Sequence, residues 1–447
     1  MNIDSQERRT EQDLQGISAL GARILAAAPE ERRALAEEYL KRRVAATLNS
    51  APEDVPIDES FLGLGLDSLM LMDVSEGVRR DLDLTLYIRE LFDQPSIEAM
   101  AKYIVSELDG RDKPSSSNTD FAALERLVSA PSEEEHAFPA RRLPSVALLL
   151  SSPRSGSTLL RVMLAGHSAL FCPPELHLLP FASMRDRQDR LDGSYLGEGL
   201  TRAIMALRNI TPEEAKAMVD DLVERNASIY DVYNMVQQAA DGKLLVDKSP
   251  SYAFSSATLA RAERLFEKPK YIHLVRHPYS TIESIVRNRM DRMLGIRDVD
   301  PNAFAETAWE LSNRNVRDFL QGIDPERQYL VRFEELVRYP RRVMSGLCAF
   351  LGVPFEEATL EPYQGNRMTD GLHAKTWGTG DPSFMSHDTI EPALGDTWQR
   401  VRLSRPLGPA AKRLAEEFSY DTGSETDPPS SGSNSADSPC GFEEGRL

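Results

Sequence analysis

The sequence predicts two domains, a small N-terminal bundle of four helices and a larger α/β domain with a parallel sheet and flanking helices. Two observations support this prediction. Between residues 29 and 108 apolar residues recur at helical spacing, and no stretch reads as a strand. After residue 145, short apolar runs alternate with helical stretches, which is the order of parallel strands joined by helices. A chain of 447 residues is long enough for two domains or three.

The composition narrows the class of protein. The formal net charge of −18 argues against general nucleic-acid binding. The three cysteines (Cys172, Cys348 and Cys440) lie far apart without metal-ligand spacing, so we expect no metal site and a reducing compartment. We see no apolar run long enough to span a membrane and no signal peptide, and therefore expect a cytoplasmic protein.

The N-terminal third divides into a leader, a bundle and a linker. Residues 1–34 are polar around an apolar patch at 17–27, which fits either a docking segment or a leader helix. In the bundle, at 35–108, we expect a first helix over 31–48, a second behind Asp67 and Ser68, a short turn at 88–91 and a last helix from 95 to 108. Residues 109–144 are rich in Lys, Pro and Ser and predict a flexible linker.

Two motifs in the bundle resemble an acyl carrier protein of the polyketide-synthase type. They are L-G-L-D-S-L-M at 64–70 and L-F-D-Q-P-S-I-E-A-M at 91–100. In that family the serine of D-S-L carries 4′-phosphopantetheine, and Ser68 is the matching residue. A serine in the first turn of a helix suits a phosphodiester, because N–H groups and the helix dipole favour negative charge there. The resemblance implies a phosphopantetheinyl transferase and an upstream polyketide-synthase module as partners.

The α/β domain, predicted over 145–420, has apolar strand candidates at 146–150, 243–246, 270–275 and 328–333. In open parallel sheets ligands bind outside the carboxyl ends of the strands, and polar motifs follow these candidates there. After residue 420 the chain is rich in Ser, Asp, Pro and Gly, so we expect the tail at 421–447 to be disordered.

The motif around which this domain is organised follows the first strand. Ser151 to Gly156 separates the strand from a helix that resumes at Leu159, and such a turn cradles an anion with backbone N–H groups. It is not a Walker A loop, since no G-K-[ST] follows at the required spacing. Arg154 takes the cationic role instead. The candidate binding residues are those of the loop (Arg154, Ser155, Gly156, Ser157 and Thr158).

Three motifs in this order resemble the sulfotransferases that use 3′-phosphoadenosine 5′-phosphosulfate (PAPS). P-R-S-G-S-T at 153–158 matches the loop that binds the 5′-phosphosulfate, and V-R-H-P-Y-S-T-I-E-S at 275–284 matches the element for the 3′-phosphate, with Arg276 and Ser284 as its phosphate ligands. F-E-E-L-V-R-Y-P at 333–340, with F-L-G at 350–352, matches a packing signature. A fourth stretch, 378–382, matches the late 3′-phosphate loop only poorly. The resemblance implies the P-loop-type sulfotransferase fold.

Sulfuryl transfer needs charge neutralisation on the leaving oxygens and a base for the acceptor hydroxyl. Arg154 and Lys248 are the candidates for neutralisation, and Lys248 stands where the protein-tyrosine branch of the family keeps a catalytic lysine. Glu175 matches the base of that branch. His177 and His373 are rivals, because imidazole titrates closer to neutral pH. We favour Glu175, with His373 second.

The fusion of carrier and sulfotransferase resembles the chain-terminating modules of polyketide synthases that make terminal alkenes. The resemblance implies sulfation of the β-hydroxyl of a carrier-bound acyl chain, followed by a thioesterase that releases the chain for decarboxylation with loss of sulfate. No G-x-S-x-G motif follows residue 420, so we expect the thioesterase in a separate protein, or this chain to be part of a longer one. Alternatives are a sulfotransferase for a free hydroxylated small molecule, a P-loop kinase, and a docking scaffold without activity.

Overall fold

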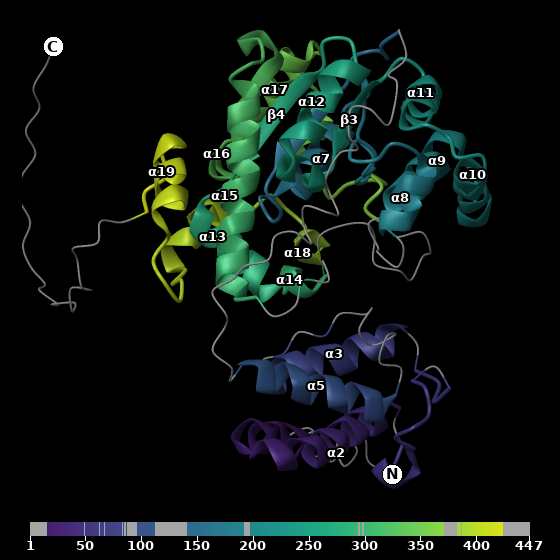
Figure 1. The fold of residues 1–447 in the computed structure, drawn as a ribbon, viewed down its shortest axis with the longest axis vertical. Coiled ribbons are helices and arrows are strands. Elements are labelled where there is room, and N and C mark those ends of the chain that lie inside the picture. Colours follow the sequence, from purple (N-terminus) through teal and green to yellow (C-terminus); the bar gives the residue numbers. More distant parts are fainter. Residues whose placement is uncertain are drawn as a thin grey trace, which may run out of the picture.

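The computed structural model describes residues 16–48, 50–61, 63–66, 68–82, 84, 86, 96–111, 141–191, 197–293, 296, 299–370, 382–385 and 387–422. Within them the chain forms a helical N-terminal domain and a larger α/β domain (Figure 1). The predicted turn at 88–91, most of the predicted linker and nearly all of the predicted tail lie outside these residues.

The N-terminal domain is a bundle whose helices share one apolar core. After a helix over residues 16–26 come α2 (Pro29–Leu48), the short η1 (Pro52–Asp54), α3 (Ser68–Leu82) and α5 (Ile97–Arg111). The core is built from Tyr39, Leu40, Val74, Val78 and Ile104, among others.

The helix at 16–26 belongs to this bundle. Ile17, Leu20 and Ile24 recur at helical spacing and are buried in the same core. The boundary predicted between residues 34 and 35 falls inside α2, and residues 1–15 lie outside the described residues. The sequence pattern left open what the patch at 17–27 packs against, and the structure places it in the bundle.

The second domain is built on a five-stranded parallel sheet with the order β2-β3-β1-β4-β5. The strands are β1 (Ala147–Ser151), β2 (Leu170–Phe171), β3 (Leu244–Lys248), β4 (Lys270–Val275) and β5 (Gln328–Arg332).

One strand runs further than its sequence predicted. β3 was expected at 243–246, but it continues through Asp247 and Lys248, which pair in register with Leu148 and Leu149 of β1. Both residues are buried, and their side chains find polar partners inside the domain. A strand end can therefore carry charged residues without leaving the sheet.

Helices cover both faces of the sheet (Figure 1). Those of the described part are α7 (Ser157–Ala165), α8 (Met184–Leu191), α9 (Glu198–Arg208), α10 (Pro212–Glu224), α11 (Ile229–Ala239), α12 (Ser256–Leu265), α13 (Pro278–Arg287), α14 (Met290–Met293), α15 (Pro301–Leu320), α16 (Phe333–Arg338), α17 (Pro340–Leu351), α18 (Pro382–Met385) and α19 (Pro409–Glu417). Short 3-10 helices add η3 (Pro250–Phe254), η4 (Pro325–Arg327), η5 (Glu357–Leu360) and η6 (Pro392–Arg400).

The strand ahead of the anion loop is buried on both sides. Leu148 and Leu150 of β1 belong to a core that also contains residues of α8 to α12 and α15. Ala147 and Leu149 point to the other face, into a core with α7, α16 and α17. The continuous apolar run at 146–150 is thus typical of a central parallel strand, as expected.

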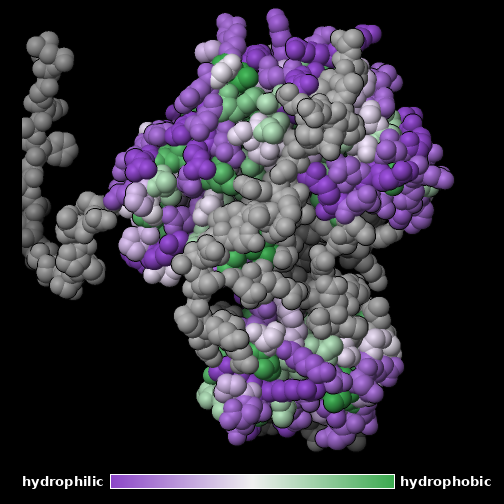
Figure 2. Space-filling model, in the orientation of Figure 1, coloured by the Kyte–Doolittle hydropathy of each residue, from purple (hydrophilic) through white to green (hydrophobic). Residues whose placement is uncertain are grey.

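The two domains touch where the helical bundle faces α14 (Figure 1). Glu107 on α5 forms an ion pair with Arg289, 3.6 Å between Oε2 and Nη1. Figure 2 shows a mostly hydrophilic face on the described parts of both domains, in keeping with their charged content. No helix in the described part of the chain is both long and apolar enough to cross a membrane.

Candidate active site

The anion loop lies between β1 and α7 and depends on two left-handed residues. Arg154 has φ 63° and Gly156 has φ 86°, and α7 begins at Ser157 directly after them. A Cβ on Gly156 would lie 2.3 Å from Cδ2 of Phe333, so both the backbone conformation and the space require glycine. Ser152 and Ser155 share a hydrogen bond of 2.7 Å inside the turn. The strand, turn and helix predicted at this place are present.

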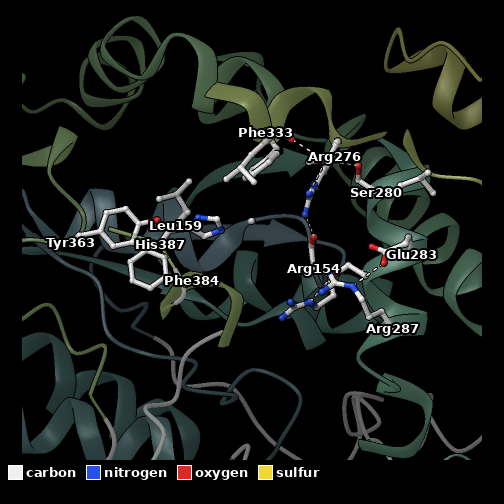
Figure 3. Close-up of a pocket in the computed structure, with 15 residues that line it drawn as sticks. Arg154, Leu159, Arg276, Ser280, Glu283, Arg287, Phe333, Tyr363, Phe384 and His387 are labelled. Carbon is white, nitrogen blue, oxygen red and sulfur yellow. Dashed lines mark hydrogen bonds and ion pairs between the residues drawn. The ribbon is translucent and has the colours of Figure 1, made fainter. Parts of the chain in front are cut away.

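The first two predicted motifs meet at this loop. Arg154 donates from Nε to the hydroxyl of Ser284 on α13 at 3.1 Å, and Arg276 donates from Nη1 to the carbonyl oxygen of Arg154 at 3.1 Å (Figure 3). The guanidinium of Arg276 also lies 4.4 Å from the centre of the Phe333 ring. Residues far apart in the sequence therefore form one cationic group, the donor cradle, made of Arg154, Arg276, Ser284 and the loop at 153–158.

A cavity of about 300 Å³ opens beside the donor cradle. Figure 3 shows its two ends, a charged one with Arg154, Arg276 and the Arg287–Glu283 ion pair, and an aromatic one with Tyr363 and Phe384. The Tyr363 and Phe384 rings are stacked, with centroids 4.7 Å apart and planes at 14°. Guanidinium groups suit phosphate and flat aromatic rings suit a nucleobase. The cavity thus has the chemistry of a nucleotide site.

Several lining residues were missed by sequence reasoning. Tyr363, Phe384, His387 and Thr397 come from segments without a recognisable motif, and they join the cavity only through the fold. Phe333 was predicted in the third motif as a packing residue. In the structure it lines the cavity, and the guanidinium of Arg276 lies over its ring. Its position directly after β5 was the one available signal.

A second polar group lies at the same edge of the sheet. Glu175, in the loop after β2, pairs through Oε1 with Nζ of Lys248 at the end of β3. Its other oxygen lies 3.1 Å from Nε2 of His177, whose Nδ1 is 2.7 Å from the hydroxyl of Ser251. Lys248 is opposite Leu149, two residues before the end of β1, so this group lies at the same edge of the sheet as the donor cradle, although neither Glu175 nor Lys248 is among the residues that line the cavity. Two residues predicted for separate roles, Glu175 and Lys248, are therefore in direct contact.

Opposing effects act on the carboxyl of Glu175. Burial raises its pKa, but the Lys248 ammonium and the hydrogen bond from His177 outweigh burial and lower the pKa to about 2. The Glu175 side chain is 24% exposed, whereas that of Lys248 is 2% exposed. Glu175 is thus an ionised carboxylate that can be reached from outside, held by a buried cation.

Other predicted residues are placed differently or not at all. His373 and residues 378–381 lie outside the described residues, so the rival base and the weak fourth motif have no position. His177 is buried against Glu175. Ser68 is the first residue of α3, as predicted, and nothing is described of its side chain. His277 caps α13 by accepting from the N–H of Tyr279 and stacks on Trp398 at 4.2 Å, a structural role.

Two family models match the chain. The one described as "Sulfotransferase family" covers residues 147–357, and the one described as "Phosphopantetheine attachment site" covers residues 38–104. The matches fall on the α/β domain and on the helical bundle, in the order that the motifs predicted.

Solved structures resemble the second domain closely. The sulfotransferase domain from the curacin biosynthetic pathway is 51% identical, with a TM-score of 0.60, and the match covers 63% of this chain and 99% of that one. The sulfotransferase domain of the Synechococcus PCC 7002 olefin synthase is 49% identical, with a TM-score of 0.59, over 64% of this chain and 99% of that one.

Curated relatives match parts of the chain. Protein-tyrosine sulfotransferase A of Caenorhabditis elegans is 23% identical over 215 residues, which is 47% of this chain. The chain spans about half the length of the protein-tyrosine sulfotransferases it matches. The polyketide synthase ThaG of Burkholderia thailandensis is 29% identical over 113 residues, 25% of this chain and 2% of that protein.

Proposed function

Because this chain belongs to the sulfotransferase family and carries a phosphopantetheine-attachment domain in the same polypeptide, we propose that it sulfates an acyl chain held on its own carrier. The donor is PAPS, and the acceptor is the β-hydroxyl of a polyketide chain bound to phosphopantetheine on Ser68. The observation that supports this best is the position of the Glu175–Lys248 pair at the same carboxyl edge of the sheet as the donor cradle.

The residues of the cradle fit a nucleotide with two phosphate groups. Arg154 and Arg276 supply fixed positive charge at one end of the cavity, which favours an anion there on an otherwise acidic protein. The stacked pair of Tyr363 and Phe384 offers a flat apolar wall for a purine. PAPS supplies the activated sulfuryl group when it is bound.

Glu175 and Lys248 divide the chemistry of the transfer. Glu175 accepts the proton of the attacking hydroxyl, while the new S–O bond forms and the bond from sulfur to the leaving phosphate breaks. Lys248 neutralises negative charge that develops on the leaving oxygen. Lys248 and His177 lower the pKa of Glu175 and burial raises it, so the contacts of these two groups set the basicity of the carboxylate.

The carrier domain supplies the acceptor. Ser68 begins a helix of 15 residues, where the N-terminal dipole favours the phosphodiester of an attached arm. A sulfate ester at the β-carbon is a good leaving group, so release of the acid by a thioesterase elsewhere, followed by loss of carbon dioxide and sulfate, gives a terminal alkene. The olefin synthase domain among the similar structures supports this choice of product class.

Mass spectrometry of the intact protein tests the proposal. The carrier is loaded with a 3-hydroxyacyl-phosphopantetheine arm, PAPS is added, and we expect one sulfonate on the carrier. Glu175→Gln should slow the transfer by about 10²–10⁴-fold because the base is lost. Ser68→Ala should accept no arm and gain no sulfonate.

Other outcomes separate the alternatives. Sulfation of a free 3-hydroxy acid at the same rate as the carrier-bound chain would show that the carrier serves another step. Phosphate transfer from ATP without any response to PAPS would make the domain a kinase. If neither donor changes the mass of the loaded parent protein, the proposed acceptor is wrong.

A further inference from the structure

Asp247 is a buried carboxylate next to Lys248, and it has no role in the sulfuryl transfer proposed above. It is fully buried in β3, and because strand residues alternate, its side chain faces away from that of Lys248. Three hydroxyl groups donate to it. Ser249 donates to Oδ1 at 2.9 Å, and Tyr252 and Tyr233 donate to Oδ2 at 2.8 and 2.6 Å.

Two of these hydroxyls also hold the loop that carries Glu175. The backbone N–H of His177 donates to the hydroxyl of Ser249 at 3.1 Å, and the N–H of Leu178 donates to that of Tyr252 at 3.0 Å. Each hydroxyl gives its proton to Asp247 and accepts one from the loop. Asp247, Ser249 and Tyr252 thus form a continuous connection, the Asp247 relay, from the end of β3 to the backbone beside Glu175.

The loop is in a conformation that needs such support. His177 has φ 45°, in the left-handed region that residues other than glycine rarely adopt. Arg187 holds the same segment from its carbonyl side, donating to the oxygens of Leu176 and His177 at 3.0 Å each. The N–H groups are held by the Asp247 relay and the carbonyl groups by Arg187, which fixes the direction in which Glu175 leaves the backbone.

We propose that Asp247 is a positioning residue that sets the place of Glu175 through Ser249 and Tyr252. The proposal rests on the proposed role of Glu175 as the base. A carboxylate is required because both of its oxygens can accept hydrogen bonds. The amide of asparagine has one acceptor oxygen, and its NH2 group would point at a hydroxyl that donates to Asp247 in the parent protein. Asp247→Asn should therefore disturb the loop although the side chain keeps its size.

The two tyrosines provide a matched test. Tyr252 and Tyr233 are both fully buried, both donate to the same oxygen of Asp247, and have hydroxyls 3.2 Å apart, but of the two only Tyr252 also accepts from the Glu175 loop. We expect Tyr252→Phe to lower kcat for sulfation of the loaded carrier by about tenfold to a hundredfold, the effect of a small misplacement of a reacting group. Tyr233→Phe should lose the same kind of hydrogen bond and leave kcat little changed.

Further readouts separate positioning from general damage. Binding of adenosine 3′,5′-bisphosphate, measured by calorimetry, should be the same in both variants, because the donor cradle is built on other elements. The pH profile of kcat should shift in Tyr252→Phe and not in Tyr233→Phe, since the contacts of Glu175 with Lys248 and His177 change only in the former. Ser249→Ala removes the other connection to the loop and should resemble Tyr252→Phe.

Distinct results would overturn the two proposals. Equal loss of kcat in both tyrosine variants, or parental kcat in both Tyr252→Phe and Ser249→Ala, refutes positioning by Asp247 while the base role stands. Parental kcat in Glu175→Gln refutes the base role, and the positioning proposal fails with it.

Discussion

Replacing Gly156 by alanine should damage the donor cradle in two separable ways. The residue has φ 86°, and an L-residue in the left-handed region costs about 1–2 kcal/mol. The added Cβ would also lie 2.3 Å from Phe333, a ring that is itself buried, and overpacking of this kind costs about 1–3 kcal/mol. We therefore expect Gly156→Ala to lower the free energy of unfolding by about 2–5 kcal/mol.

Gly242→Ala is the matched control for the backbone cost. Gly242 has φ 80°, in the same region, but an added Cβ would meet nothing within 4 Å. We expect Gly242→Ala to lower the free energy of unfolding by about 1–2 kcal/mol. Urea unfolding of both variants then isolates the contact with Phe333 as the difference between them.

The same substitution should weaken donor binding. A displaced Phe333 moves Arg276, which lies over its ring and bonds to the loop. Losing one charged hydrogen bond of about 1.5–3 kcal/mol weakens binding roughly 10- to 150-fold. Calorimetry with adenosine 3′,5′-bisphosphate measures this, and Gly242→Ala should bind as the parent does. Parental affinity in Gly156→Ala, with unfolding equal to that of Gly242→Ala, would refute the reasoning.

Two further predictions concern the Glu175 loop and pH. A Cβ on Gly199 would lie 2.0 Å from the carbonyl oxygen of Glu175, whereas a Cβ on Gly197 would meet no atom within 4 Å. We therefore expect Gly199→Ala to lower kcat for sulfation and Gly197→Ala to leave kcat unchanged. Equal kcat values in the two variants would contradict this prediction. Burial lowers the pKa of His273 and His277 to about 4, so the unfolded chain takes up protons first as pH falls below 6.5. Stability present above pH 6.5 is then lost toward pH 4, roughly 2 kcal/mol for each histidine between pH 7 and 5. A free energy of unfolding, measured with urea, that stays constant between pH 7 and pH 5 would contradict this prediction.

The sequence predicted those parts of the site that lie within one local pattern. The strand, turn and helix around Arg154 are continuous in the chain, and the strand ends carrying Lys248 and Arg276 follow from apolar runs and parallel topology. The confirmed predictions are the parallel α/β fold, the sulfotransferase family and the carrier domain.

Contacts between distant segments could not be predicted. The pairing of Glu175 with Lys248, the hydroxyls around Asp247 and the aromatic end of the cavity depend on how loops cross the sheet edge. Nothing in the local spacing of Tyr252 or Tyr363 indicates their partners. The packing of the helix over 16–26 stayed open in the sequence for the same reason, because an apolar patch does not show which core it joins.

The covalent connection between the domains has a consequence for how tightly they need to bind. The helix α5 ends at Arg111 and β1 begins at Ala147, so about 35 residues join them and limit their separation to about 120 Å. Such a tether holds the carrier near the cradle at an effective concentration in the millimolar range. The tether therefore acts together with the Glu107–Arg289 ion pair, whose side chains are only 6% and 18% exposed, and the two keep the carrier domain beside the α/β domain without a large free energy of binding between separate proteins.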